Sequence, residues 1–443
     1  MNTPQTAPST THLSDATARD GSKFEKNLEA LRGLAAFVVL LHHGLAPYYL
    51  DPHFRPSGIF TYDPPGHDSV ILFFILSGFV IGLTNKGYLT LATVGAYIKK
   101  RLVRIYPIYF ISVLFALGVS AFKYRLVTIL LNMAFLQIVA ATVITENSPI
   151  WTLHYEIVFY LMFIPFSLFR LGPKILALIL TVIGFLNYFV QDIFYSPLLS
   201  TYLFGFTFWL LGIVISNNFK TKRPSISYPL LVSQLLLFMS LNYMNPIETL
   251  LRKATIMLFH HQLSFSEASV WYNKINIYDY ALVPYAFVCI LVFINASFQY
   301  RGSILRLLQL LPVLHLVYIF KNRHDADLIN PFIIPVGLYI ISTLIFFSRK
   351  YISSWSGNGL IEALVRVGSI SYGLYIIHYP FLYIFNRIEV FSGTPFTYVV
   401  RLMIFILIVF LGAYFLEKRF QQLVIRFVRT TPQKLDSLAG PVH

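Results

Sequence analysis

The chain has 443 residues, of which 56% are hydrophobic and only 12% are charged, whereas soluble domains carry about 25% charged residues. This composition excludes an ordinary soluble domain and, with several apolar runs of around 20 residues, predicts an all-α polytopic membrane protein. The formal net charge of +15 does not indicate nucleic-acid binding, because the basic residues cluster between apolar segments as in cytoplasmic loops.

The apolar segments predict a bundle of about 10 to 12 transmembrane helices. The candidate spans are 28–47, 68–85, 104–122, 153–170, 174–191, 199–216, 228–244, 279–297, 304–321, 331–348, 370–387 and 397–416. The stretch 125–144 is ambiguous. We expect it to be re-entrant or to lie on the membrane surface, because the positive clusters and both termini then fall on the cytoplasmic side.

Three regions follow from this pattern. Residues 1–22 are polar and are expected to form a disordered cytoplasmic tail. Residues 23–420 make up the transmembrane domain, and residues 421–443 form a basic cytoplasmic tail.

The first span contains Arg32 near its start and His42 and His43 near its end. An ionisable group at membrane depth is energetically costly and usually functional. At about 100° per residue, the eleven positions from Arg32 to His43 make close to three turns, so both side chains share one helix face, roughly 16 Å apart. This arrangement predicts a site that binds an anionic ligand and moves a proton.

Two polar groups mark the second and third spans. Ser77 and Gly78, in the segment 73–79, allow close helix approach, so they either pack helices or line the site. Arg101 and Arg104 are three residues apart and share a helix face at a membrane boundary. Such a guanidinium pair suits phosphates, although positive-inside anchoring alone would also explain it.

Two further polar groups interrupt later spans. Glu156 lies one turn into an apolar helix that begins near Trp151. A carboxylate there needs a partner, and we expect His43 or an arginine, either for function or as a structural ion pair. His378, which follows Tyr372, is a second histidine within a span, and the pattern favours a site residue and a packing residue equally.

No metal site is predicted. His260, His261 and Glu267 lie in the polar loop 245–278, but no other group has ligand spacing. Cys289, the only cysteine, lies in an apolar run that is typical of a buried packing residue. The sequence also has no Gly-rich phosphate loop, no Gly-x-Ser-x-Gly elbow and no His-Glu-x-x-His motif.

Taken in order, these segments resemble the acyltransferase 3 family of integral membrane acyltransferases. Arg32 and His43 match the family's arginine and histidine with ten residues between them, which favours His43 over His42. Segment 73–79 resembles its Phe-Phe-x-Leu-Ser-Gly-Phe, and 101–104 its Arg-x-x-Arg. Segment 151–156 resembles its Trp-Ser/Thr-Leu-x-x-Glu, and 371–380 its Ser-Tyr-x-x-Tyr-x-x-His-x-Pro. The closing Glu-x-Pro-Phe is matched at 417–420, except that Arg419 replaces the proline.

This resemblance covers residues 24 to about 420. It implies a membrane-bound O-acyltransferase of the stand-alone kind, without a fused hydrolase-like domain, in the bacterial inner membrane. Such enzymes commonly transfer acetyl from acetyl-coenzyme A to a hydroxyl of a cell-envelope carbohydrate or glycolipid, such as O-antigen or exopolysaccharide. The expected partners are therefore this donor, that acceptor and membrane lipids, with no nucleic acid and no metal.

The resemblance also implies roles for the singled-out residues. The expected catalytic residues are His43, Glu156 and Arg32; the donor-binding residues are Arg101, Arg104 and Arg32; the substrate-binding residues are Trp151, Ser77, His378 and Tyr372. Direct transfer with His43 as general base and a covalent acyl-histidine both remain open. The main alternative function is a glycolipid or polysaccharide transporter or flippase, which would also place Arg, His and Glu inside a bundle. A different class of membrane O-acyltransferase is disfavoured by the early Arg-x10-His.

Overall fold

The computed structural model describes residues 11–46, 49–85, 87–189, 197–219, 227–259, 274–321, 324, 329–352 and 358–428. Over these ranges the chain is helical, with one isolated bridge between Gln137 and Ala141 and no strand, which confirms the all-α class. Within the same ranges nine helices are long and apolar enough to cross a membrane, or ten if a bent pair counts as one span. The protein is therefore a multi-pass integral membrane protein.

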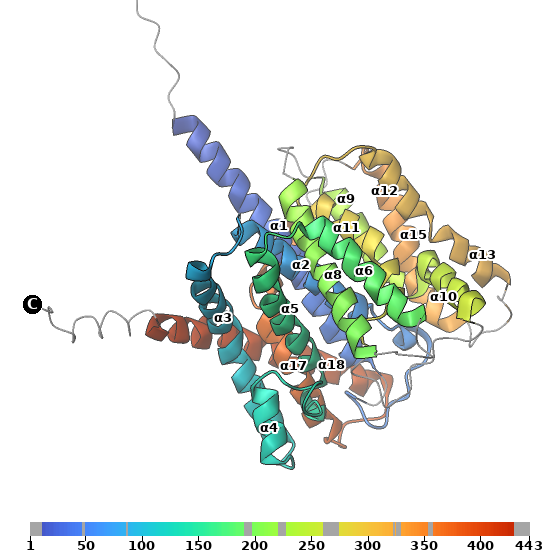
Figure 1. Cartoon of the computed structure of the whole chain (residues 1–443). Helices are drawn as coiled ribbons and strands as arrows, with labels where there is room; N and C mark the ends of the chain where they lie inside the picture. Colours follow the sequence, from blue (N-terminus) through green and yellow to red (C-terminus); the bar gives the residue numbers. More distant parts are fainter. Residues whose placement is uncertain are drawn as a thin grey trace, which may run out of the picture.

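The helices pack into one bundle (Figure 1). In chain order they are α1 (Thr11–Leu45), α2 (Gly66–Thr84), α3 (Leu91–Val119), α4 (Leu126–Met133), α5 (Trp151–Leu168), α6 (Pro173–Phe189), α8 (Pro197–Asn218), α9 (Tyr228–Met244), α10 (Pro246–Phe259), α11 (Val283–Phe293), α12 (Arg301–Leu310), α13 (Val313–Lys321), α15 (Ile333–Ser348), α16 (Asn358–Gly368), α17 (Ser371–Asn386) and α18 (Pro395–Phe415). The short helices η1 (Gly58–Thr61), η2 (Thr145–Ile150), η4 (Ile277–Ala281), η5 (Asn330–Phe332) and η6 (Leu416–Phe420) connect them.

Some predicted spans differ from the observed helices. The predicted span 279–297 contains the end of η4 and the eleven-residue α11, which is short for a span. The predicted span 304–321 lies within Arg301–Lys321, one of the nine candidate spans of the described ranges, but it is interrupted between α12 and α13 beside Pro312, because proline lacks the N–H that a continuous helix needs. α1 already begins at Thr11, inside the segment 1–22 that was expected to be a disordered tail. Beyond α18 the helical path continues through η6 to Val428.

The ambiguous stretch 125–144 does not cross as a helix. α4 has eight residues, so it rises about 12 Å, well short of a hydrocarbon core of about 30 Å. The chain then turns at Phe135 and Ile138, which have positive φ values of 59° and 99°, and enters η2. This agrees with the expectation that the stretch does not fully span.

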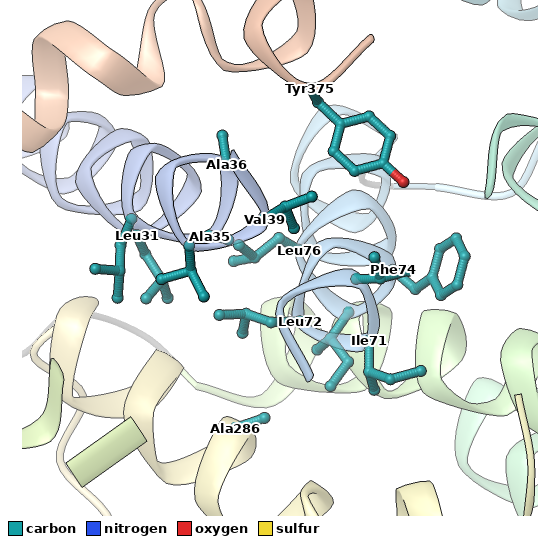
Figure 2. Packing of buried hydrophobic residues seen from close by; sticks show 14 of the residues in the cluster. Leu31, Ala35, Ala36, Val39, Ile71, Leu72, Phe74, Leu76, Ala286 and Tyr375 are labelled. Atoms are coloured by element: carbon teal, nitrogen blue, oxygen red, sulfur yellow. The ribbon is translucent and has the colours of Figure 1, made fainter. Parts of the chain in front are cut away.

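The core begins where α1 and α2 meet. Leu31, Ala35 and Val39 follow one another at helical spacing on α1 and are almost fully buried. Figure 2 shows Val39 at the end of this row beside Leu76 of α2. Because α1 and α2 are held in this way, the polar side chains on their other faces keep a defined position.

α2 and α8 approach one another through glycine. A Cβ atom on Gly78 would lie 1.8 Å from the carbonyl oxygen of Trp209, and one on Gly212 would lie 1.9 Å from that of Ile75. Small residues at such crossings let membrane helices pack closely. Ser77 and Gly78 were expected either to pack helices or to line the site. Gly78 packs the helices, whereas Ser77 lines the polar cavity described below.

Outside the spans, the loop that follows α1 is held by Asp51. Its Oδ1 accepts hydrogen bonds from the backbone N–H groups of His53 (3.1 Å), Phe54 (3.0 Å) and Gly393 (3.2 Å), and from the hydroxyl of Ser392. Burial by itself would raise the pKa of Asp51, but these four donors outweigh burial and leave the pKa lowered. The carboxylate thus ties the loop after α1 to the loop before α18.

Candidate active site

A cavity of about 130 Å³ lies between α1, α2, α3, α5 and α17. Six residues predicted for the site line it: Arg32, Ser77, Arg101, Arg104, Glu156 and Tyr372. The packing of five helices far apart in sequence therefore brings together the cationic, acidic and hydroxyl groups that the sequence places on separate spans. Thr152, Tyr160 and Tyr375 also line the cavity and were not predicted.

Arg101 is the most buried of the cavity arginines, with 7% of its surface exposed. Its guanidinium lies near the rings of Tyr97 and Tyr160, at 5.7 and 5.8 Å from the ring centroids, and its Nη2 donates to the hydroxyl of Thr84 (3.2 Å). Its Nε is buried and has no hydrogen-bond partner among the described residues. A buried, unsatisfied guanidinium N–H is unfavourable.

The helix that carries Arg101 and Arg104 is fixed by an internal proline. Pro107 lacks the N–H that would bond the carbonyl of Val103, and Gln421 donates its side-chain amide to that carbonyl instead (2.7 Å). The freed backbone acceptor thus joins α3 to the helical segment that follows η6. Arg32 forms a separate ion pair with Glu29 on its own helix (3.3 Å).

Glu156 is held by hydroxyl groups. Its Oε1 accepts from Ser77 (2.9 Å) and from Tyr160 (2.5 Å), and the indole N–H of Trp209 donates to the Ser77 hydroxyl (3.3 Å). The prediction that His43 or an arginine would pair with Glu156 was wrong, because the hydrogen bonds to this carboxylate come from hydroxyl groups. Tyr160 lies four residues after Glu156 on α5, so helical spacing would have identified this partner. His43 lies in the last turn of α1, about three turns beyond Arg32, which lines the cavity with Glu156.

His43 is hydrogen-bonded to the second intramembrane histidine. His378 is fully buried, and its Nε2 lies 3.1 Å from Nδ1 of His43. His378 Nδ1 donates to the carbonyl oxygen of Tyr375 (2.7 Å), and His43 Nδ1 lies 3.1 Å from that of Val39. Carbonyl oxygens only accept, so both Nδ1 atoms carry the proton and His378 Nε2 accepts from His43. His43 therefore keeps its lone pair on Nε2.

The position of His378 depends on a second internal proline. Pro380 on α17 leaves the carbonyl of Ile376 without its usual helical donor, and the side chain of Asn147 in η2 donates to that carbonyl (3.1 Å). At the start of α17, the Glu417 carboxylate accepts from the backbone N–H of Gly373 (3.1 Å) and caps the helix. These two contacts define the register of His378.

The two histidines lie beyond one end of the cavity. Tyr375 lines the cavity, and its ring is 5.8 Å from Phe73 and 6.1 Å from His378. The ring of His378 in turn lies 5.0 Å from that of His43. Of the predicted site residues, Trp151 also does not line the cavity, because it packs edge-on against Tyr155 at 5.6 Å.

A contact between His42 and the carboxylate of Asp63 was not predicted from the sequence. Nδ1 of His42 lies 2.5 Å from Oδ1 of Asp63 and 3.1 Å from the carbonyl oxygen of Pro64. The rings of His42 and His43 are 4.9 Å apart at 73°. Asp63 lies in the loop before α2, and a lone loop carboxylate in sequence carries no periodicity that would connect it to His42.

Metal-binding groups are absent as far as the structure describes the chain, since no cluster of three or more His, Cys, Asp or Glu side chains is formed there. His260, His261 and Glu267 lie outside the described residues. Cys289 is a free, buried thiol on α11, as expected for a packing residue.

Comparison with known proteins agrees with this arrangement. A family model described as an acyltransferase domain matches residues 25–418, which is nearly the whole chain. No curated protein and no solved structure matches the chain. The protein belongs to the acyltransferase 3 family and is a membrane acyltransferase.

Proposed function

We propose that the protein transfers an acetyl group from acetyl-coenzyme A to a hydroxyl of a cell-envelope carbohydrate or glycolipid, in the bacterial inner membrane with both termini cytoplasmic. Family membership supports the acyl transfer itself. The observation that carries the choice of donor is the arginine-lined cavity, in which the Nε of Arg101 is buried and has no hydrogen-bond partner within the described part of the chain.

The charge of the cavity favours a phosphorylated donor. Among the described residues, three guanidinium groups, from Arg32, Arg101 and Arg104, line it together with one carboxylate, that of Glu156. Guanidinium groups bind phosphates through paired N–H donors, and the diphosphate of coenzyme A supplies such acceptors. Lys99 and Lys100 directly precede Arg101 on α3. Such a cluster of basic residues favours a position of the arginines at the cytoplasmic face of the membrane, where acetyl-coenzyme A is available.

The acyl group would then meet His43. In this proposal the pantetheine arm of the donor passes the rings of Phe73 and Tyr375, which lie next to the histidine pair. Nε2 of His43 is the available base or nucleophile, and His378 accepts the Nδ1 proton and stabilises the positive charge that develops on the ring. General-base assistance is worth about 10² to 10⁴ in rate, and both direct transfer and an acyl-histidine begin at this nitrogen.

Aromatic residues on the far side of His43 support a carbohydrate or glycolipid acceptor. The ring of Tyr379 lies 5.1 Å from His43, and that of Tyr49 lies 5.8 Å from Tyr379. Tyr49 is 39% exposed. Aromatic side chains with an apolar face and a hydroxyl suit amphipathic ligands at a membrane boundary, so we place the acceptor entrance here.

The test uses detergent-purified protein with acetyl-[¹⁴C]coenzyme A and membranes of the producing cells as the acceptor source. We expect alkali-labile label in glycan or lipid together with release of the coenzyme A thiol. A transporter would produce neither, and that result would refute the proposal. Mass spectrometry of the envelope from cells with and without the protein then identifies the acceptor.

Arg101→Gln tests the donor site. Loss of charge-assisted hydrogen bonds, each worth about 1.5–3 kcal/mol, should raise the KM for acetyl-coenzyme A about 10- to 150-fold. The KM for acetyl-pantetheine, which has no phosphate, should not change. Arg125→Gln, on the exposed end of α4, is the matched control. Equal effects of Arg101→Gln on both donors would contradict phosphate binding at this site.

A further inference from the structure

His42 has the geometry of a base with its own carboxylate. Its Nδ1 faces two acceptors, Asp63 Oδ1 at 2.5 Å and the carbonyl oxygen of Pro64 at 3.1 Å. Nδ1 must therefore carry the proton, which leaves the lone pair on Nε2. Asp63 is itself held by Asn242, whose side-chain amide donates to the Asp63 carbonyl oxygen (2.8 Å) and lies 3.4 Å from its Oδ2.

This pair is accessible, unlike His378. The side chains of His42 and Asp63 are 31% and 46% exposed. Solvent-exposed ion pairs contribute little to stability, so a purely structural role explains the pairing poorly. The chain also makes room for the ring, because a Cβ atom on Gly66 would lie 2.4 Å from Cγ of His42.

Two neighbouring imidazoles thus present Nε2 atoms that have no hydrogen-bond partner among the described residues, and their Nδ1 atoms have different partners. His43 is backed by the neutral His378, and His42 by a carboxylate. A carboxylate stabilises the imidazolium that forms when the ring takes a proton, whereas a neutral partner gives less stabilisation to a full positive charge. The ring centroids are 4.9 Å apart, so one bound substrate can contact both.

We propose, on the basis of the proposed function, that His42 is the base that deprotonates the acceptor hydroxyl and that Asp63 is its positioning residue. First, Nε2 of His43 attacks the thioester carbonyl carbon, the C–S bond breaks, and the coenzyme A thiolate leaves. Then the acceptor oxygen attacks the acyl carbon and its proton passes to Nε2 of His42. The C–N bond breaks and its electron pair returns to His43. His42 releases the proton to solvent, and the thiolate takes up one proton, so the reaction balances.

Hydroxylamine as the acceptor distinguishes the role of His42 from that of His43. It is neutral and strongly nucleophilic near pH 7, so it does not need a base to attack the acyl group. Purified protein with acetyl-coenzyme A and hydroxylamine should form acetohydroxamate, which reports the donor half-reaction alone. Ester formation in native membranes with acetyl-[¹⁴C]coenzyme A reports both halves.

His42→Ala should lower ester formation by about 10²- to 10⁴-fold, the range of general-base assistance. Acetohydroxamate formation should stay within about threefold of the wild-type rate, because hydroxylamine needs no base. Retained acetohydroxamate formation also shows that the variant is folded. His43→Ala should abolish both reactions. Asp63→Asn should lower ester formation about tenfold or more with KM for the donor unchanged, and Asp63→Glu should restore part of it.

His67→Gln is the matched control, since His67 also pairs with a carboxylate, that of Asp279 (2.8 Å), near the start of α2. We expect both reactions to be unchanged in this variant. Wild-type activity of His42→Ala in both assays would overturn the role of His42 while the acyltransferase assignment stands. An equal loss in both assays would also overturn it. A wild-type protein that acylates neither acceptor would instead refute the proposed function.

Discussion

His378→Ala is the most informative test of how His43 is activated. The substitution removes the nitrogen, 3.1 Å away, that accepts the proton of His43 Nδ1. The carbonyl oxygen of Val39 remains at 3.1 Å, so the tautomer that leaves His43 Nε2 free is kept. We therefore expect His43 to stay competent but to lose stabilisation as its ring becomes positively charged.

The magnitude follows from one hydrogen bond to a charged group. Such a bond is worth about 1.5–3 kcal/mol, which corresponds to about a 10- to 150-fold decrease in kcat. His378 does not line the cavity, so the KM for acetyl-coenzyme A should not change. His378→Gln should recover much of the rate, because its amide oxygen can occupy the position of the lost acceptor.

Acetohydroxamate formation under saturating acetyl-coenzyme A measures this effect without the natural acceptor. A His378→Ala variant with wild-type kcat would refute the idea that His378 supports His43. A loss as complete as that of His43→Ala would also refute it, since His378 would then be indispensable in its own right.

Three further predictions follow from the packing and the loops. Gly66→Ala should displace the ring of His42, which lies 2.4 Å from the added Cβ, and lower ester formation while acetohydroxamate formation persists. Gly78→Ala should destabilise the protein by about 1–3 kcal/mol, measured as a lower unfolding temperature in detergent, because its Cβ would lie 1.8 Å from the Trp209 carbonyl oxygen. Asp51 has a lowered pKa in the folded protein, so its contribution to stability is present above its unfolded pKa of about 3.9 and is lost as the pH falls through the folded value. Asp51→Asn should therefore lower the unfolding temperature at pH 7 and flatten its decline in acid.

Each of these has a contrasting result. Gly118→Ala meets open space and should leave stability unchanged, so an equal effect at both glycines would argue against the α2–α8 contact. Gly66→Ala that slows both reactions alike would show a general disturbance of α2. An acid profile of Asp51→Asn parallel to that of the wild type would exclude Asp51 as the titrating group.

Much of the site follows from local patterns in the sequence. Helical spacing places Arg32 and His43 on one face of α1, and the cost of burying charge marks Arg101 and Glu156 as residues with a purpose. Each of these inferences depends only on residues within one helix. Tyr160 follows Glu156 by four residues, so helical spacing also predicts their contact, although an ion pair was expected for Glu156.

The partners across helices were decided by tertiary packing. His43 and His378 are 335 residues apart in the chain, and their contact depends on the register of α17, which Pro380 and Asn147 define. Periodicity predicts which face of a helix is polar, but not which other polar face it meets or at what height. The sequence alone therefore determined a membrane acyltransferase with an arginine and a histidine on its first span. Only the packed bundle decided that His43 is supported by His378, because contacts between distant segments depend on how whole helices fit together.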